Sequence, residues 1–238
     1  MSIRVLRHAR ILVPRALRAP LKGALRFLPA TFKHAEEIQY WRGEWIAGRF
    51  DNSHYKRIML GMAGEADDSF ISGKIVADFG CGPMGSLSWA TLAKERIGID
   101  VLASAYSQFD IRSHGMTYVT STERTIPLPS DFIDVMFTVN AMDHVSHFGR
   151  MCNEILRILA VGGMFIGSFN LGEPRTLSEP QTLTEDMIDH KLLRYLEVLS
   201  RRTAPAGEVG NVYKYFSETC HIKDAHANFL WVCARKPV

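Results

Sequence analysis

The sequence predicts an α/β protein: a doubly wound, mostly parallel seven-stranded sheet with helices on both faces and an N-terminal helical cap. Two observations carry this prediction. Strand-like apolar runs alternate with helix-like segments from residue 75 to residue 170, as expected for parallel strands joined by crossovers. The first run, Ile75–Phe79, leads directly into three glycines at G-x-G-x-x-G spacing, a turn typical of ligand-binding sheets of this class.

Each part of the glycine turn has a task. Gly80 suits a tight turn, Gly82 lets a ligand approach the backbone, and Gly85 lets the next helix pack close to the strand. We expect that helix over residues 86–94, with the ligand over its N-terminus, where unpaired N–H groups point outward. Pro83 removes one N–H donor, which suits a ligand without phosphates better than a pyrophosphate.

Two carboxylates accompany the glycines. Asp78 lies inside the strand end, two residues before the first glycine, where it can reach the same ligand. A second strand, residues 96–100, ends in Asp100, at about 20 residues' distance, where an acid accepts hydrogen bonds from ribose hydroxyls. The pattern Asp-x-Gly-x-Gly-Pro-x-Gly followed by Gly-Ile-Asp resembles the class I S-adenosylmethionine-dependent methyltransferases.

The resemblance covers about residues 70–170 and implies the cofactor. S-adenosyl-L-methionine would donate the methyl group, and S-adenosyl-L-homocysteine would be the product. The family acid that contacts adenine falls near Thr122, so the contact would come from the adjacent Glu123 or from backbone groups around Thr122. The implied cofactor-binding residues are Asp78, Gly80, Cys81, Gly82, Gly85, Asp100, Val101, Thr122, Glu123 and Asn140.

The remaining elements follow from local patterns of apolar, capping and turn residues. They are a helix at 101–109, strands at 116–120 and 135–139, a helix at 147–159 ended by Gly162 and Gly163, a strand at 164–169, a helix to residue 193 opened by a capping box of Thr182 and Glu185, and strands at 196–200 and 229–234. A long polar stretch, 201–227, separates the last two strands.

Charge and local patterns divide the chain into a basic arm (1–34), a helical cap (35–70) and a domain at 71–238, which the resemblance implies is the methyltransferase domain. Residues 1–35 hold eight Lys/Arg and no acid, so with a total of +3 the rest carries a net −5. The basic charge therefore belongs to the arm, which argues against a nucleic-acid substrate. The arm suits packing on the body, peripheral contact with anionic membrane or, less well because serine is scarce, organelle targeting.

The cysteines indicate a reducing compartment, because Cys81, Cys152, Cys220 and Cys233 show no paired spacing. No apolar run approaches the roughly 18 residues of a membrane span. Basic residues interrupt the first 30 positions, which argues against a secretory signal. We therefore expect a cytoplasmic protein, with membrane-peripheral contact through the arm as a variant; the sequence predicts no oligomeric state.

Catalysis is expected just beyond the fourth strand. The methyl group of a sulfonium is already activated, so the protein mainly aligns the acceptor for in-line displacement. His144, with Asp143 beside it, suits a general base for a hydroxyl acceptor because imidazole titrates near neutral pH. The alternative is that His144 lines the pocket or caps the next helix. The pattern predicts no metal site.

A small-molecule acceptor methylated on oxygen or nitrogen fits best, such as a sugar, a glycan precursor or a secondary metabolite. The Asn-Pro-Pro-Tyr motif of base-amino methyltransferases and the nucleic-acid-binding motifs are absent from the sequence. Simple packing and a loop salt bridge are the alternative roles for the candidate acceptor-binding residues, which are Tyr40, Trp41, Glu44, Tyr55, Glu173 and Arg175.

Two other classes stay open. A methyltransferase-like domain used only for binding or scaffolding would keep the glycines and Asp100 and lose function on the acceptor side. An NAD-dependent oxidoreductase shares the glycine turn, but Asp78, Pro83 and the Gly162–Gly163 turn disfavour it.

Overall fold

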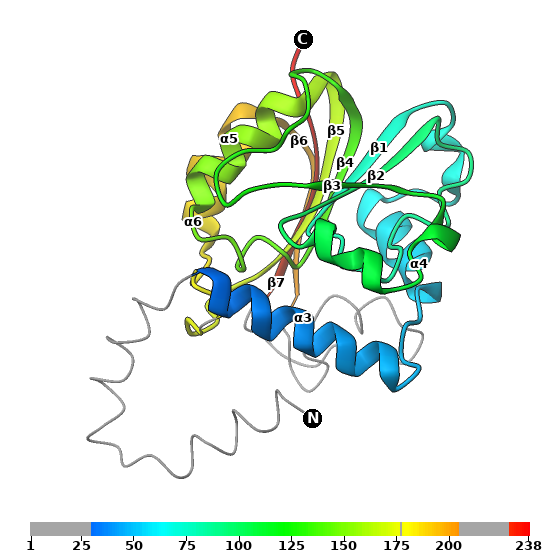
Figure 1. Ribbon diagram of the computed structural model, residues 1–238. Helices are drawn as coiled ribbons and strands as arrows, with labels where there is room; N and C mark the ends of the chain where they lie inside the picture. Colours follow the sequence, from blue (N-terminus) through cyan, green and yellow to red (C-terminus); the bar gives the residue numbers. More distant parts are fainter. Residues whose placement is uncertain (1–29, 177, 205–228) are drawn as a thin grey trace, which may run out of the picture. The chain divides into compact units, whose positions relative to one another are not determined.

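The computed structural model describes residues 30–176, 178–204 and 229–238 (Figure 1). Contacts divide the chain into two units, each described by itself: residues 1–50 with 176–178, and residues 51–175 with 179–238. The expected cap at 35–70 is therefore split, because helix α3 (Ala30–Ile46) falls in the first unit and helix α4 (Ser53–Ala63) in the second. Most of the basic arm lies outside the described residues.

In the second unit, the described residues form a seven-stranded sheet in the order β3-β2-β1-β4-β5-β7-β6 (Figure 1). Its strands are β1 (Ile75–Phe79), β2 (Glu95–Asp100), β3 (Thr117–Thr120), β4 (Ile133–Val139), β5 (Leu159–Asn170), β6 (Glu197–Ala204) and β7 (Phe229–Arg235). The first five pair in parallel, and β7 runs antiparallel between β5 and β6. The predicted doubly wound sheet is confirmed, with the order reversing beside β1, where ligands of such sheets bind.

Helices cover both faces because successive strand residues point to opposite sides. On one face, Ala77 of β1 belongs to a core with α5 (Phe148–Ile158) and α6 (Glu185–Lys191). On the other face, the neighbouring Val76 belongs to a core with α4. Both clusters hold fully buried side chains, so the sheet is a rigid platform for the loops at its carboxyl edge.

The prediction of a helix over residues 86–94 is wrong. The segment follows successive turns, with the N–H groups of Ser88 and Ala90 bonded to the carbonyls of Gly85 and Leu87, each at 3.0 Å. Serine, tryptophan and threonine are weak helix formers, and a nine-residue segment gains little from propensity alone. The N–H groups after the glycines therefore belong to a loop and not to a helix N-terminus.

Three further boundaries differ. The crossing helix at 101–109 is a short 3-10 helix, Ala103–Gln108. Helix α5 ends at Ile158 in an extended residue, so Gly162 and Gly163 lie inside β5 instead of ending the helix. The expected polar stretch begins later, because β6 continues to Ala204; residues 205–228 lie outside the described part.

The start of α6 also differs from the predicted capping box. Thr184 is the N-cap, and its hydroxyl accepts the N–H of Met187 at 3.2 Å. The hydroxyl of Thr182 instead donates to the carbonyl of Glu173 at 2.9 Å, which ties the end of the β5 loop to the start of α6.

Within the described residues, no helix combines the length and apolar character needed to cross a bilayer. The described cysteines, Cys81, Cys152 and Cys233, are buried free thiols, as predicted from their spacing, and Cys220 lies outside the described residues.

Candidate cofactor and acceptor site

The predicted cofactor residues meet at the carboxyl ends of β1 to β4. The N–H of Gly80 donates to the carbonyl of Ile99 at 2.8 Å, and the N–H of Ser121 donates to that of Asp100 at 3.0 Å. These contacts join the loops after β1, β2 and β3 into one rim. Cys81, 2% exposed, lies beneath this rim, and Val101 follows Asp100 as a half-buried residue.

Asp100 organises the glycine loop with its own carboxylate. One oxygen accepts the N–H of Gly82 at 3.1 Å and the other accepts the N–H of Leu102 at 2.9 Å. Each carboxylate oxygen has a second lone pair, so these bonds leave it able to accept a ribose hydroxyl as well. Asp100 thus holds the glycine loop, and ribose binding by its carboxylate stays a prediction.

Asp78 is buried at the centre of the rim, 2% exposed. Its Oδ2 accepts the hydroxyl of Ser86 at 2.5 Å, while its Oδ1 finds no hydrogen-bond partner among the described residues. A buried acceptor without a partner is costly, which makes it a place where a ligand donor would bind. Ser86 was not predicted, although its position directly after the third glycine is a usable signal.

Burial raises the pKa of the Asp78 carboxyl to about 7. The hydrogen bond from Ser86 acts to lower this pKa, and the nearby charge of Asp100 acts to raise it. The folded protein therefore holds this proton more tightly than the unfolded chain, whose reference value is 3.8. Stability of the unliganded protein should fall as pH rises from about 4 to about 7 and then level off. The asparagine of Asp78→Asn is neutral at every pH, so this variant should lack the pH-dependent contribution of residue 78 to stability.

The measurement is urea unfolding of both proteins at pH 5 and pH 8 without ligand. We expect the free energy of unfolding of Asp78→Asn minus that of the wild type to be larger, that is, the variant relatively more stable, at pH 8 than at pH 5. Parallel pH profiles for the two proteins would show that Asp78 does not titrate in this range.

The end of β4 packs directly against the first glycine. Asn140 adopts φ +55°, a left-handed conformation that is uncommon outside glycine. Its buried Oδ1 also lacks a partner among the described residues. A side chain on Gly80 would meet the Cβ of Ala141 at 2.2 Å, so glycine is required there by contact as well as by its φ of +75°. Strained backbone and unsatisfied oxygens together are typical of a binding site.

The segment after β3, expected to contact adenine, is fixed by a turn. The hydroxyl of Thr122 accepts the N–H groups of Arg124 at 3.1 Å and Thr125 at 2.9 Å, and its own N–H donates to the carbonyl of Thr125. The carboxylate of Glu123 accepts the N–H of Ser146 at 3.1 Å. Glu123 therefore links the predicted cofactor rim to the loop after β4.

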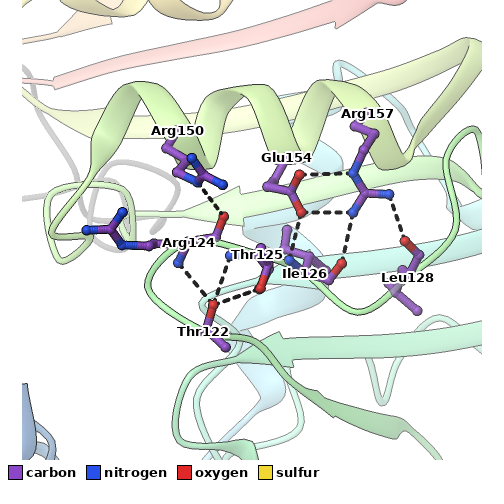
Figure 2. Close-up of polar contacts among 8 residues, drawn as sticks. All are labelled: Thr122, Arg124, Thr125, Ile126, Leu128, Arg150, Glu154 and Arg157. Carbon is purple, nitrogen blue, oxygen red and sulfur yellow. Dashed lines mark hydrogen bonds and ion pairs between the residues drawn. The ribbon is translucent and has the colours of Figure 1, made fainter.

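Helix α5 anchors this segment from its other end (Figure 2). Glu154 accepts the N–H of Ile126 at 2.9 Å, and Arg157 donates to the carbonyl of Ile126 at 2.9 Å while pairing with Glu154 at 2.8 Å. Figure 2 shows both side chains reaching from the helix to the same strip of backbone. Charge-assisted bonds of this kind fix backbone position better than neutral ones.

Beyond β4, four titratable side chains lie within electrostatic reach of one another: Asp143, His144, Glu173 and Glu179. Asp143 is 4% exposed, and burial raises its pKa, with His144 opposing and Glu179 adding to the shift. Burial, then Glu179 and Asp143, raise the pKa of Glu173. Glu179 was not predicted, because nothing in its local sequence distinguishes it from a surface acid.

Ligating atoms of Asp143, His144 and Glu179 all lie within 4.8 Å of one another, a spacing that can also hold a metal ion, although the sequence predicts none. The loop carrying the first two is held by Gln181, whose amide donates to the carbonyls of Val145 at 3.2 Å and Ser146 at 3.1 Å. This arrangement can accept a proton or hold a cationic group.

The other acceptor candidates lie in different surroundings. Tyr55 is buried in the core between α4 and the sheet, 5% exposed, and Arg175 is exposed. Tyr40, Trp41 and Glu44 lie on α3 in the first unit, which is described separately. There, Glu44 pairs with Arg49 at 2.7 Å, and this hydrogen-bonded partner lowers its pKa.

Residues 77–167 match the family model of a methyltransferase domain. No curated protein matches the sequence. Among solved structures, the chain is similar to an S-adenosylmethionine-dependent methyltransferase from Mesorhizobium loti, with a TM-score of 0.55 and 19% identity over 78% of this chain and 99% of that one.

A second structure, a putative S-adenosylmethionine-dependent methyltransferase from Listeria monocytogenes, gives a TM-score of 0.53 and 18% identity, covering 76% of this chain and 99% of that one. A third structure, the [4+2]-cyclase SpnF, gives a TM-score of 0.56 and 17% identity, covering 77% of this chain and 81% of that one. The same fold thus occurs in proteins named for different chemistry, so the acceptor must be argued from the site itself.

Proposed function

We propose that this chain, a class I S-adenosylmethionine-dependent methyltransferase, transfers the methyl group to oxygen or nitrogen of a small molecule, with His144 as the general base. S-adenosylmethionine is the cofactor of this family and S-adenosylhomocysteine its product. The bond from Ser146 to Glu123 supports the proposal most, because Ser146 belongs to the loop that carries His144 and Glu123 to the predicted cofactor rim. Methyl donor and proton acceptor would then face one acceptor molecule.

Within this proposal the cofactor binds on the rim built by Asp78, the glycine loop and Asp100. The oxygens of Asp78 and Asn140 that lack a partner among the described residues suit its N–H and O–H donors, such as the ammonium group. When bound, the cofactor supplies an activated methyl group, and the protein's own task is alignment. Proximity and orientation supply much of the rate enhancement of such displacements.

The acid-rich surroundings of His144 support the assignment of a base. Asp143 and Glu173 stabilise a positive charge on the imidazole, since both interact electrostatically with it. A proton taken from an acceptor hydroxyl or ammonium would therefore leave on His144 a positive charge that faces these carboxyl groups.

The test begins with an acceptor. The full chain is incubated with S-adenosylmethionine and a panel of sugars, phenols, hydroxy acids and amines, and release of S-adenosylhomocysteine is measured. With a hydroxyl acceptor found, His144→Ala should lower kcat by about 10²- to 10⁴-fold, the usual size of a general-base contribution. Its affinity for S-adenosylhomocysteine should stay unchanged.

His147→Ala is the matched control, because His147 is exposed three residues further on. An unchanged kcat in His144→Ala would remove the base from the proposal. Activity lost on chelation and restored by Mn²⁺ would assign Asp143, His144 and Glu179 to a metal ion instead of proton transfer.

A further inference from the structure

The loop that follows the glycines has no helix to fix it, so other elements must hold its backbone. The amide of Asn52, the residue before α4, donates to the carbonyl of Gly85 at 3.5 Å and to the hydroxyl of Ser88 at 3.4 Å. Arg96 donates to the carbonyl of Ser88 at 3.1 Å. These bonds hold one side of the loop.

Tyr118 of β3 reaches the opposite side. It pairs in register with Gly98 of β2, where a side chain would meet its ring at 3.2 Å and the Cys81 sulfur at 2.7 Å. The missing side chain lets the tyrosine ring lie across β2 toward the glycine loop. There the N–H of Gly85 lies near the Tyr118 hydroxyl and opposes the rise in its pKa that burial causes.

His114 completes the contact. Its Nδ1 lies 2.8 Å from the Tyr118 hydroxyl. A side chain on Gly85 would meet its ring at 2.6 Å, so the imidazole occupies the space that any larger residue at position 85 would need. Gly85 therefore packs against His114, which is itself hydrogen-bonded to Tyr118, and both residues lie about thirty positions later in the chain.

We infer that Tyr118 and His114 are positioning residues for the cofactor: they hold Gly85, and through it the glycine loop, in the conformation that binds S-adenosylmethionine. Neither residue needs to touch the ligand. They replace the fixing role that a helix after the third glycine would have. The inference rests on the proposed cofactor site.

The direction of this hydrogen bond follows from the distances. The Tyr118 hydroxyl carries one hydrogen, and the His114 Nδ1 at 2.8 Å is a better placed acceptor for it than the Met116 sulfur at 3.9 Å. The imidazole is then neutral, with its hydrogen on Nε2. Burial lowers the pKa of His114, in agreement with this state.

The test compares Tyr118→Phe, His114→Ala and His114→Asn with the wild type by calorimetric titration of S-adenosylhomocysteine. Tyr118→Phe and His114→Ala should each weaken binding about five- to tenfold, the effect of one lost hydrogen bond. His114→Asn should restore most of the affinity, because its amide oxygen can accept near the Nδ1 position. The double variant should lose little more than either single one, since the pair acts as a unit.

With the acceptor found above, the KM for S-adenosylmethionine should rise while kcat changes little, a split that general destabilisation does not produce. Tyr195→Phe is the control, because Tyr195 is 51% exposed. Wild-type affinity in Tyr118→Phe, or equal losses in His114→Asn and His114→Ala, would overturn the inference. Failure of the wild type itself to bind would instead count against the proposed cofactor.

Discussion

Asp100→Ala is expected to abolish measurable binding of S-adenosylmethionine and S-adenosylhomocysteine. The substitution removes the acceptor of two backbone N–H groups, those of Gly82 and Leu102, and with them the shape of the loop. It also removes the carboxylate predicted to bind the ribose. Hydrogen bonds to charged groups contribute about 1.5–3 kcal/mol each, so losing two or more should weaken binding by at least about 100-fold.

Calorimetric titration of both ligands and of NAD into the full chain checks this. Asp186→Ala serves as control, because Asp186 is an exposed acid in the first turn of α6. Micromolar binding that is lost only in Asp100→Ala would establish the site. Binding of NAD alone would return the chain to the oxidoreductase class. Binding of none of the three would indicate a degenerate domain or a cofactor pocket that is completed only when the acceptor arrives.

Gly80→Ala is expected to destabilise the fold by more than about 3 kcal/mol. Losses of this size arise from severe steric overlap or backbone strain. Two effects combine: a left-handed φ of +75° and a contact of 2.2 Å with the Cβ of Ala141. The chain offers a matched control, since Gly64 has the same φ of +75° with nothing within 4 Å. Gly64→Ala should therefore show the conformational effect alone, about 1–2 kcal/mol.

Urea unfolding of the two variants separates strain from contact. In the Gly80→Ala background, Ala141→Gly should relieve the contact and bring the loss of stability down to the Gly64→Ala level. Equal losses in the two single variants would mean that the loop moves away from Ala141 at no energetic cost, and that Gly80 is kept for its backbone conformation only.

The strands and the rim were predictable because their signals are local. Ile75–Phe79 is an apolar run followed by glycines, and Asp100 ends the next apolar run, so both carboxyl ends are marked in the sequence itself. Parallel pairing then brings Asp78, Asp100 and Asn140 to one edge without further information. The structure agrees on each of these elements.

The segment after Gly85 could not be predicted for the opposite reason. Leu87 and Ala90 are fully buried, a pattern that a helix and a chain of turns satisfy equally. What decides between them is contact with His114, which Tyr118 holds, and with Asn52, all of them remote in sequence. Glu179 is a similar case, since only the path of the chain after β5 brings it to His144.

The place of β7 has a consequence for the order in which the molecule forms during synthesis. It is the last of the described strands along the chain, yet it lies between β5 and β6 and pairs with both. While the ribosome is still making the residues before 229, β5 has an unpaired apolar edge and β6 has no neighbour in the sheet. The half of the sheet that carries the proposed cofactor site, β1 to β4, can pair during translation, whereas the other half must wait for β7.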